Sequence, residues 1–529
     1  MDPLIDRALL GDFRLFDRSE IETSLPKRFA KIVAEHASRV AIRDGEADVT
    51  YAELDRESNR IAHTLLETLG RGREPVALLY EQGASVHKAQ LGVLKSGKLY
   101  ACFDPELRPE KRLRLLADLN ARAILCSTKM EPLAREACRE LPGVRVIGTE
   151  AGALSGEITP PDVEVGPDDY ACVVYTSGST GPPLGVLTSH RSMLHFTMSQ
   201  TNRMHVGPHD LGAQVCPLSS GASNGEIFPI LMNGGTLLPM HVKTRGVRHL
   251  ARWLKEQKVT MLVAVPTLFR LVAANAGGDG HFPDMRMVRL SGDRILRKDL
   301  ELFQRHFSDR CLLRVALGAA EAGLYSDLYL HLRSTLEREV VPAGYALPDM
   351  NVFVVDDDLN RLPPGEVGEI AVESRYFSVG YWNNEAMTAE RFLDSPTQPG
   401  ARIYLTRDIG YVQEDGCFIH LGRKDSRVKL YGKMVMLTDL EEALLELPGI
   451  DNAVVVPILS DGADTALAAY YVGRGDAPPS DETMRQHLLS RFPIEILPKR
   501  FVRLDELPTT DRNKIDRRGL MMYGGRVPL

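Results

Sequence analysis

The stretch DYACVVYTSGSTGPPLGV, residues 169–186, joins an apolar run to a loop of small and hydroxyl-bearing residues. The apolar run over 170–175 predicts a buried strand. The loop from Tyr175 to Gly181 contains two glycines and five hydroxyl-bearing side chains. Backbone N–H groups in such a loop can converge on an anion, and the hydroxyls add donors without bulk. The stretch therefore predicts a strand followed by a phosphate-binding loop, with an ordinary turn as the alternative.

Strand–helix alternation extends on both sides of this stretch. Short apolar runs, each next to an amphipathic segment, recur at 74–80, 121–126, 144–148, 260–266 and 285–292. Alternation of this kind predicts parallel sheets covered by helices, which is an α/β fold.

The pattern changes near residue 420. Residues 420–437 predict a hairpin, and Thr438 and Glu441 have the spacing of a helix capping box. Strand, strand, helix and strand patterns follow at 452–458, 466–472, 480–492 and 500–507. This is an α+β module of roughly a hundred residues, the usual size of a small domain. We expect a large N-terminal domain of helix-covered sheets, 1–424, and a small C-terminal domain, 425–529, joined by a hinge at Asp425.

Composition narrows the classes of partner. The chain has 529 residues, enough for at least two domains, and a formal net charge of -7, which argues against a nucleic-acid or anionic-membrane surface. The seven cysteines are scattered without a CxxC pair, so neither a disulfide framework nor a zinc site is expected. No signal-peptide pattern or long apolar run is present, and we expect a cytoplasmic protein with a small-molecule substrate.

Further motifs follow the loop in a distinctive order. They are LGAAEAG (317–323), GYWNNEAMTAERF (380–392), YLTRDIG (404–410), LGRKDSRVKLYGK (421–433) and LPTTDRNKIDR (507–517). With these motifs the chain resembles the acyl-adenylate-forming (ANL) superfamily, and most closely a stand-alone adenylation domain of a non-ribosomal peptide synthetase. The resemblance implies that ATP and a carboxylic acid form an acyl-adenylate and pyrophosphate. The acyl group would then pass to a thiol, because AMP makes the carboxyl group's oxygen a leaving group.

The resemblance also implies nucleotide-binding roles. The loop residues that would cradle the outer phosphates are Thr176, Ser177, Gly178, Ser179, Thr180 and Gly181. The segment that would contact the nucleotide comprises Leu317, Gly318, Ala319 and Ala320. Glu321 would hold Mg²⁺, a hard cation that prefers carboxylate and phosphate oxygens. Asp408 would accept the ribose hydroxyls, and Arg423 would reach the ribose and phosphates.

Three further roles come from the same resemblance. Lys514 would bridge the attacking carboxylate and the α-phosphate, where a preorganised cation stabilises developing charge. Asp425 would be the pivot of the small domain, and Lys429 and Gly432 would belong to the face used for thiol transfer. Taken one at a time, each of these residues has a simpler alternative as a turn, cap or surface charge.

Several positions depart from the superfamily pattern. Leu184 stands where the loop lysine is usual, Arg407 replaces a glycine and Ala320 a threonine, and Leu317 stands where a tyrosine commonly stacks on adenine. The loop lysine assists the outer phosphates, so we expect weaker ATP binding with activity retained. A catalytically impaired scaffold in a biosynthetic assembly is the alternative.

The predicted acid pocket also departs from relatives that activate α-amino acids. Gly221 stands where those relatives have an aspartate that binds the amino group, so an ordinary α-amino acid is disfavoured. The other predicted pocket residues are Ala222, Gly225, Val263, Arg289, Ser291, Ala316, Leu324 and Tyr325. Small residues dominate, which predicts a roomy, largely apolar pocket. Arg289 is expected either to pair with a second substrate carboxylate or to turn outward, and Glu226 either to anchor a displaced amine or to have no such role.

The sequence leaves undecided which molecule accepts the acyl group. Only fifteen residues follow Lys514, so we expect the phosphopantetheine of a carrier protein in trans. Coenzyme A is the nearest alternative, and an amine acceptor is more distant.

Overall fold

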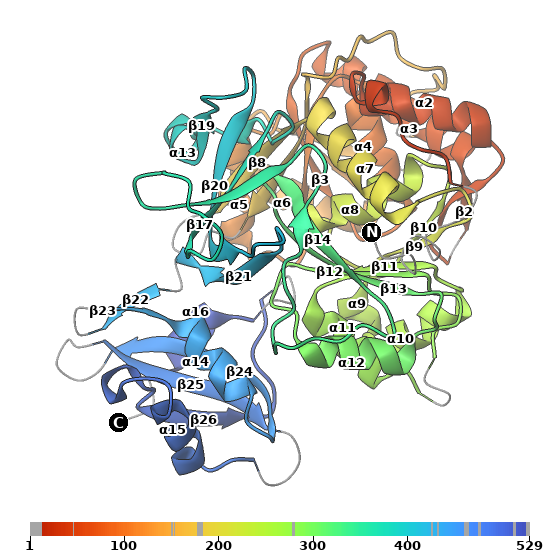
Figure 1. Cartoon of the computed structure of the whole chain (residues 1–529). Coiled ribbons are helices and arrows are strands. Elements are labelled where there is room, and N and C mark those ends of the chain that lie inside the picture. The colour runs from red at the N-terminus through yellow and green to blue at the C-terminus, as the bar shows by residue number, and fades with distance from the viewer. Residues whose placement is uncertain are drawn as a thin grey trace.

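The computed structural model describes most of the chain. The described residues are 13–45, 47–149, 152, 154–176, 183–277, 281–424, 427–430, 433–459, 465–473, 478–510 and 515–524. Figure 1 shows a larger body formed by the first four-fifths of the chain and a smaller body, in blue, formed by its C-terminal part. In the described part of the chain, every helix is too short or too polar to span a membrane.

The first sheet has seven strands in the order β18-β8-β7-β4-β3-β5-β6. Their bounds are β3 Pro75–Leu79, β4 Leu99–Phe103, β5 Ala123–Cys126, β6 Arg145–Gly148, β7 Tyr170–Thr176, β8 Leu184–Ser189 and β18 Gly380–Tyr381. Strands β3 to β7 pair in parallel, and β8 and β18 are antiparallel. Every residue of β3 is buried, because helices cover both faces of a parallel sheet.

The helices of the first third of the chain are α2 Leu25–His36, α3 Tyr51–Leu69, α4 Ala84–Lys95, α5 Pro109–Leu119 and α6 Glu131–Arg139, with short 3-10 turns η1 Arg18–Ile21 and η2 Thr128–Met130. Helix α4 packs on β3 and β4, helix α6 packs on β5 and β6, and α2 packs on α3 and α4. Helix α3 starts with a capping box in which Thr50 and Glu53 satisfy each other's backbone N–H groups.

The second sheet has nine strands in the order β15-β14-β13-β12-β11-β9-β10-β1-β2. Their bounds are β1 Val40–Arg43, β2 Asp48–Thr50, β9 Leu211–Gln214, β10 Thr236–Pro239, β11 Met261–Ala264, β12 Met287–Ser291, β13 Leu312–Ala319, β14 Gly323–Leu330 and β15 Tyr345–Ala346. The helices of this part of the chain are α7 His190–Met204, α8 Gly221–Leu231, α9 Val242–Arg245, α10 Val247–Glu256, α11 Pro266–Ala274 and α12 Arg297–His306. Helix α7 packs on β7 and β8 of the first sheet, and α8 packs on β9 and β10 of the second. A shared core of buried residues from α3, α4, α7 and α8 joins the two sheets.

A third, antiparallel sheet completes the larger body, and the sequence patterns did not predict it. It consists of β16 Asn351–Val355, β17 Gly368–Ser374, β19 Phe392–Asp394, β20 Arg402–Val412 and β21 Phe418–Arg423, with α13 Glu385–Arg391 beside it. Strand β21 pairs with β20 along Asp408↔Arg423 to Val412↔Phe418. The predicted hairpin over 420–437 is therefore wrong at its start, because the first residues of that run belong to this sheet.

The smaller body has its own core. Its elements are β22 Arg427–Leu430, β23 Lys433–Met436, α14 Leu437–Leu445, β24 Ile450–Leu459, β25 Thr465–Gly473, α15 Asp481–Leu489, η4 Ile494–Ile496, β26 Arg500–Leu504 and α16 Arg517–Gly524. Strands β22 and β23 form the hairpin, and β24, β25 and β26 form a sheet. Buried apolar side chains such as Leu440, Val455 and Met484 form a cluster with others from this region. The α/β fold with an α+β C-terminal part agrees with the sequence prediction.

The predicted capping box at Thr438 is wrong. The Thr438 hydroxyl donates to the Leu421 carbonyl oxygen, and helix α14 begins at Leu437, so Thr438 lies inside the helix. Glu441 is fully buried and accepts hydrogen bonds from the backbone N–H of Val455 and the guanidinium of Arg517. The side chains of Thr438 and Glu441 therefore bond to residues distant in sequence and do not form a local cap.

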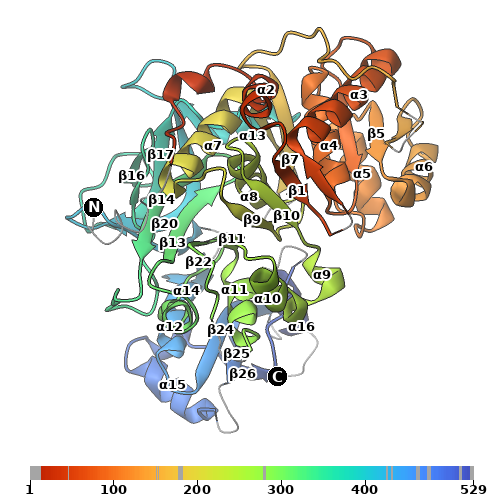
Figure 2. The same cartoon turned by 90° about the vertical axis from the view of Figure 1, so that its right-hand side faces the viewer.

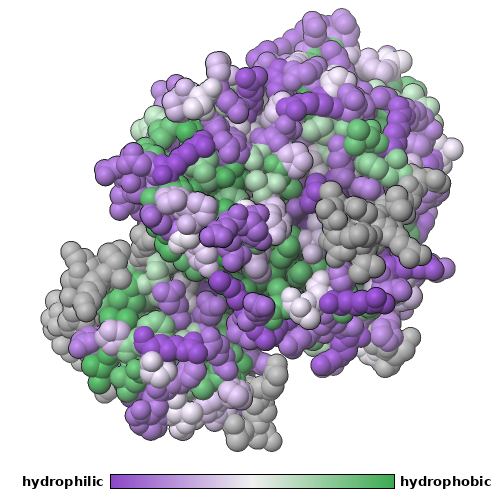
Figure 3. All heavy atoms as spheres, viewed as in Figure 1, coloured by the Kyte–Doolittle hydropathy of each residue, from purple (hydrophilic) through white to green (hydrophobic). Residues whose placement is uncertain are grey.

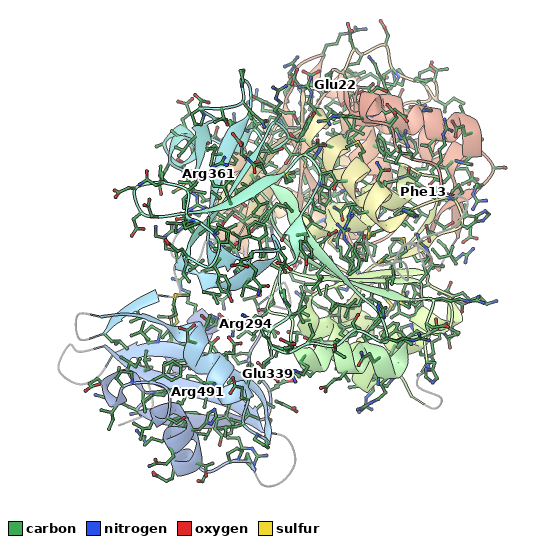
Figure 4. All side chains as sticks on the ribbon, viewed as in Figure 1. Phe13, Glu22, Arg294, Glu339, Arg361 and Arg491 are labelled. Atoms are coloured by element: carbon green, nitrogen blue, oxygen red, sulfur yellow. The ribbon has the colours of Figure 1, made fainter. Side chains whose placement is uncertain are left out.

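The two bodies are in direct contact. Arg294 of the larger body donates to the buried carboxylate of Glu441, and Lys298 of α12 donates to the Asp451 carbonyl oxygen. Figures 1 and 2 both place the smaller body beside α12, and Figure 4 shows Arg294 at this junction. The face drawn in Figure 3 is mainly hydrophilic, with hydrophobic residues in small groups.

Candidate active site

A cavity of about 770 Å³ lies where the two large sheets, the third sheet and the C-terminal segment meet. Thr176 at the end of β7 and Leu184 at the start of β8 line it, on either side of the glycine-rich loop. Thr510 and Ile515 of the C-terminal segment line it as well. Ligands bind at the carboxyl ends of strands in α/β sheets, and β7 and β12 present such ends here.

The turn between β13 and β14 forms one wall. Gly318, Ala319, Ala320 and Glu321 all line the cavity. A Cβ at Gly318 would lie 2.3 Å from the Gly323 carbonyl oxygen, so only glycine permits this close backbone approach. The carboxylate of Glu321 accepts a hydrogen bond of 2.8 Å from the Tyr381 hydroxyl, which orients it.

Asp408 lies behind this wall in β20. It is 6% exposed and accepts a hydrogen bond of 3.0 Å from the Tyr325 hydroxyl. Arg423 approaches it at 3.5 Å and lines the cavity. Burial opposes ionisation, but the His420 ring, whose Nε2 lies 3.4 Å from the carboxylate, and the charge of Arg423 outweigh it, so the pKa of Asp408 lies below its ordinary value.

Helix α8 begins at another wall. Ser220 caps the helix by accepting from the backbone N–H of Ala222, and Gly221 and Ala222 line the cavity. A Cβ at Gly221 would meet Ala320 Cβ at 3.6 Å, so the first turn of α8 lies against the β13–β14 turn. The predicted acid pocket and the predicted nucleotide segment are thus adjacent in space.

Strand β12 contributes Arg289 and Ser291, whose alternate positions put both side chains on the cavity face. Arg289 is 2% exposed, so the expectation that it turns outward is wrong. Its Nη1 donates to Gln200 Oε1 at 3.0 Å. Burial and the neighbouring Arg314 lower the pKa of Arg289 to about 10, which leaves it charged at neutral pH.

Comparison with known proteins identifies the family. Residues 29–382 match the family described as AMP-binding enzyme. The chain belongs to the AMP-binding enzyme family. This confirms the predicted resemblance to the ANL superfamily and places the protein among adenylate-forming ligases.

Curated relatives of this AMP-binding enzyme are much longer proteins. It is 30% identical over 506 residues to tyrocidine synthase 3 of Brevibacillus parabrevis, an alignment that covers 94% of this chain and 8% of the relative. It is 31% identical over 495 residues to phosphinothricin tripeptide synthetase PhsC of Streptomyces viridochromogenes, covering 92% and 44%. The chain therefore spans less than half the length of these relatives.

A solved structure shares the fold. Klebsiella oxytoca NpsA, determined in complex with 3-hydroxyanthranilyl-AMSN, superposes with a TM-score of 0.81 at 22% identity and covers 95% of this chain and 99% of its own. At this identity the match establishes the architecture.

Other predicted residues of the AMP-binding enzyme do not line the cavity. They are Gly225, Val263, Ala316, Leu317, Tyr325 and Asp408. Strand periodicity explains the contrast between Leu324, which lines the cavity, and Tyr325, which points the other way to Asp408. Gly225 lies directly behind the lining, since a Cβ there would be 2.7 Å from Arg289 Nη2.

Part of the prediction lies outside the described residues. This holds for Ser177, Gly178, Ser179, Thr180, Gly181, Asp425, Gly432 and Lys514. The backbone of Lys429 lies in β22, and its side chain is outside the described set. Thr510 and Ile515 are the described residues on either side of the segment that contains Lys514, and both line the cavity.

Sequence reasoning missed several lining residues. His195 and Phe196 of α7 line the cavity, as do Tyr376 and Arg391. The His195 ring stacks on Tyr376 at 4.0 Å, and its Nε2 contacts Asp349 at 3.2 Å. Helix α7 is buried on most sides, so the spacing of its apolar residues does not show which face lines the cavity. The only signal in its sequence was its apolar and aromatic content.

Glu226 does not fit the role of amine anchor. Its carboxyl group accepts hydrogen bonds from the backbone N–H groups of Val215 and Cys216, and it does not line the cavity. Burial raises the pKa of Glu226 to about 8. Through its hydrogen bonds to Val215 and Cys216, Glu226 holds the β9–α8 connection in place.

The described lining is electrostatically positive. Its arginines are Arg289, Arg391, Arg407 and Arg423, whereas Glu321 is its one carboxylate. Among the described residues, no three His, Cys, Asp or Glu side chains gather as a metal site. This donor set fits a cation held by one carboxylate and by phosphates, the arrangement that Mg²⁺ commonly adopts.

Proposed function

We propose that this AMP-binding enzyme activates a carboxylic acid with ATP, releases pyrophosphate, and transfers the acyl group to the phosphopantetheine thiol of a carrier protein. One observation carries the proposal. A single cavity is lined by the nucleotide segment at Glu321, by the acid pocket at Gly221 and by Thr510 and Ile515, which flank the segment containing Lys514. Acid, nucleotide and a catalytic cation would meet there.

The chain's own residues would divide the work as follows. Thr176 and the loop after it would hold the outer phosphates through N–H and hydroxyl donors. Asp408 would accept the ribose hydroxyls with Arg423 beside it. Lys514 would neutralise the approach of the acid's oxygen to the α-phosphorus. Mg²⁺ bound at Glu321 would neutralise charge on the phosphates.

The acid is proposed to be other than an ordinary α-amino acid. A bound ammonium group would need a carboxylate near Gly221, and the described cavity lining offers only Glu321, which is hydrogen-bonded to Tyr381 at the nucleotide wall. Leaving a charged amine unpaired beside four arginines would be costly.

The two half-reactions would use two orientations of the small domain. We propose that the boundary lies between residues 424 and 425, with Asp425 as hinge and with Lys429 and Gly432 on the face that accepts the carrier. A separate core in the smaller body supports motion as a unit. A cytoplasmic location is part of the proposal, because ATP and reduced thiols are available there.

Acid-dependent exchange of labelled pyrophosphate into ATP, with a panel of carboxylic acids, tests the first half-reaction. Lys514→Ala should lower exchange by about 10²–10³-fold, the usual effect of losing one preorganised donor, with an unchanged melting temperature. Mass spectrometry of a holo carrier protein, coenzyme A and amines then identifies the acceptor. Absence of exchange with every acid, together with tight carrier binding, would instead favour the scaffold.

A further inference from the structure

Arg289 is a buried cation that the protein leaves without a carboxylate. It forms no ion pair with any of the described residues, and its one hydrogen bond within that set goes to the neutral side chain of Gln200. Its Nε has no hydrogen-bond partner there. A buried guanidinium is most stable when its charge and its N–H donors are matched, so a ligand in the cavity that supplied a negative charge would stabilise Arg289.

Neighbouring side chains do not supply that partner. Gln200 Oε1 is shared with Arg314, which donates to it at 2.7 Å. The nearby carboxylate, Asp327, accepts from Arg314 at 2.8 Å and from Arg203 at 2.7 Å, so two other arginines already share its charge. Glu226 accepts from the backbone N–H groups of Val215 and Cys216 and forms no ion pair or hydrogen bond with Arg289 among the described residues. The region around Arg289 thus keeps an excess of positive charge.

The guanidinium faces the cavity rather than a closed core. Arg289 and Ser291 line it together, and Gly225 leaves the space that the guanidinium fills. Gly225 lies four residues after Gly221 on helix α8, a separation of about 6 Å along the axis. Gly221 lies against the β13–β14 turn, where the reacting carboxyl group would sit. The span from that turn to Arg289 therefore suits a short chain or a single ring.

We propose that the acid activated by this enzyme carries a second carboxylate, and that Arg289 binds this distal carboxylate at the far end of the cavity. The inference rests on the proposed adenylation function and adds the substrate class to it. A carboxylate matches the planar fork of a guanidinium in a way that a hydroxyl or a carbonyl does not.

The test compares diacids with monoacids in which a methyl group replaces the distal carboxylate. Pyrophosphate exchange is measured for succinate against butyrate, glutarate against pentanoate, adipate against hexanoate, and isophthalate against 3-methylbenzoate. The wild-type protein should give a higher kcat/KM for at least one diacid than for its partner, by about 10²-fold, because charge-assisted hydrogen bonds are lost with the methyl group.

Variants then locate the preference. Arg289→Met should abolish it, whereas Arg289→Lys should retain part of it because the charge remains. Gly225→Ala, whose Cβ would be 2.7 Å from Arg289 Nη2, displaces the guanidinium without removing it and should weaken the preference.

Arg407→Met is the matched control, since Arg407 lines the same cavity near the nucleotide wall. It should lower exchange equally for both members of a pair. Thermal melting checks that each variant is folded. If Arg289→Met does not fold, the effect of Gly225→Ala on the preference for diacids decides the question.

The outcomes separate the two proposals. Exchange that is equal or better with monoacids, and indifferent to Arg289, overturns the inference and leaves adenylation standing. Exchange with none of the acids tested here or in the wider panel overturns adenylation and, with it, the inference.

Discussion

The contact between Arg294 and Glu441 is expected to hold the two bodies in the orientation seen here. Glu441 is fully buried in the smaller body and keeps Arg517 and the Val455 N–H as partners when Arg294 is replaced. Arg294→Gln therefore removes one charge-assisted hydrogen bond without stranding the carboxylate. Such a bond contributes about 1.5–3 kcal/mol. The population of this orientation, relative to others, should fall by a factor of about 10–150.

Distances between spin labels on the two bodies measure this shift. Labels on exposed positions of α12 and α15 should give a narrow distribution in the wild-type protein and a broader one in Arg294→Gln. Pyrophosphate exchange should fall in parallel. Thr510 and Ile515 line the cavity in this orientation, and under the proposed function they leave it when the smaller body turns.

Arg491→Gln is the control for this experiment. Arg491 pairs with Glu446 inside the smaller body and lies away from the junction in Figure 4. An exposed pair of this kind contributes at most about 1 kcal/mol, and its loss should leave the distance distribution unchanged. Identical distributions for wild type and Arg294→Gln would refute the reasoning that this contact holds the bodies together.

Three further perturbations test other parts of the structure. Asp327→Asn leaves Arg203 and Arg314 without their shared carboxylate, and urea unfolding should show a loss of about 3–5 kcal/mol; a loss under about 1 kcal/mol contradicts the network. Asp408 has a folded pKa below its unfolded value of 3.8, so the stability it adds over Asp408→Asn should be complete above that pH and disappear as pH falls through the folded pKa. A constant difference in unfolding free energy across this range would show that the carboxylate is not stabilised in the folded protein. A Cβ at Gly221 would make only ordinary van der Waals contacts, so Gly221→Asp should be tolerated and should raise pyrophosphate exchange with α-amino acids about 10–100-fold over wild type; unchanged selectivity would show that Gly221 does not face the reacting end of the acid.

Local sequence determined the elements that depend on short-range patterns. The apolar runs at 74–80 and 170–175 became β3 and β7, since a short continuous run of apolar residues suits a strand whose two faces are both covered. The order of motifs predicted the family, and the turn at Glu321 and the start of α8 at Gly221 do line one cavity. Backbone pattern and side-chain type suffice for such features because neighbours along the chain create them.

Tertiary structure alone decided which partners Thr438 and Glu441 found. Thr438 and Glu441 have the spacing of a local cap, yet Leu421, Arg517 and Arg294 take their hydrogen bonds, because burial rewards partners that are distant in sequence. The orientation of Arg289 was open in the sequence for the same reason. A strand residue faces one side of its sheet or the other, and only the packing of α7 and α8 against β12 determined that this side is the wall of a cavity.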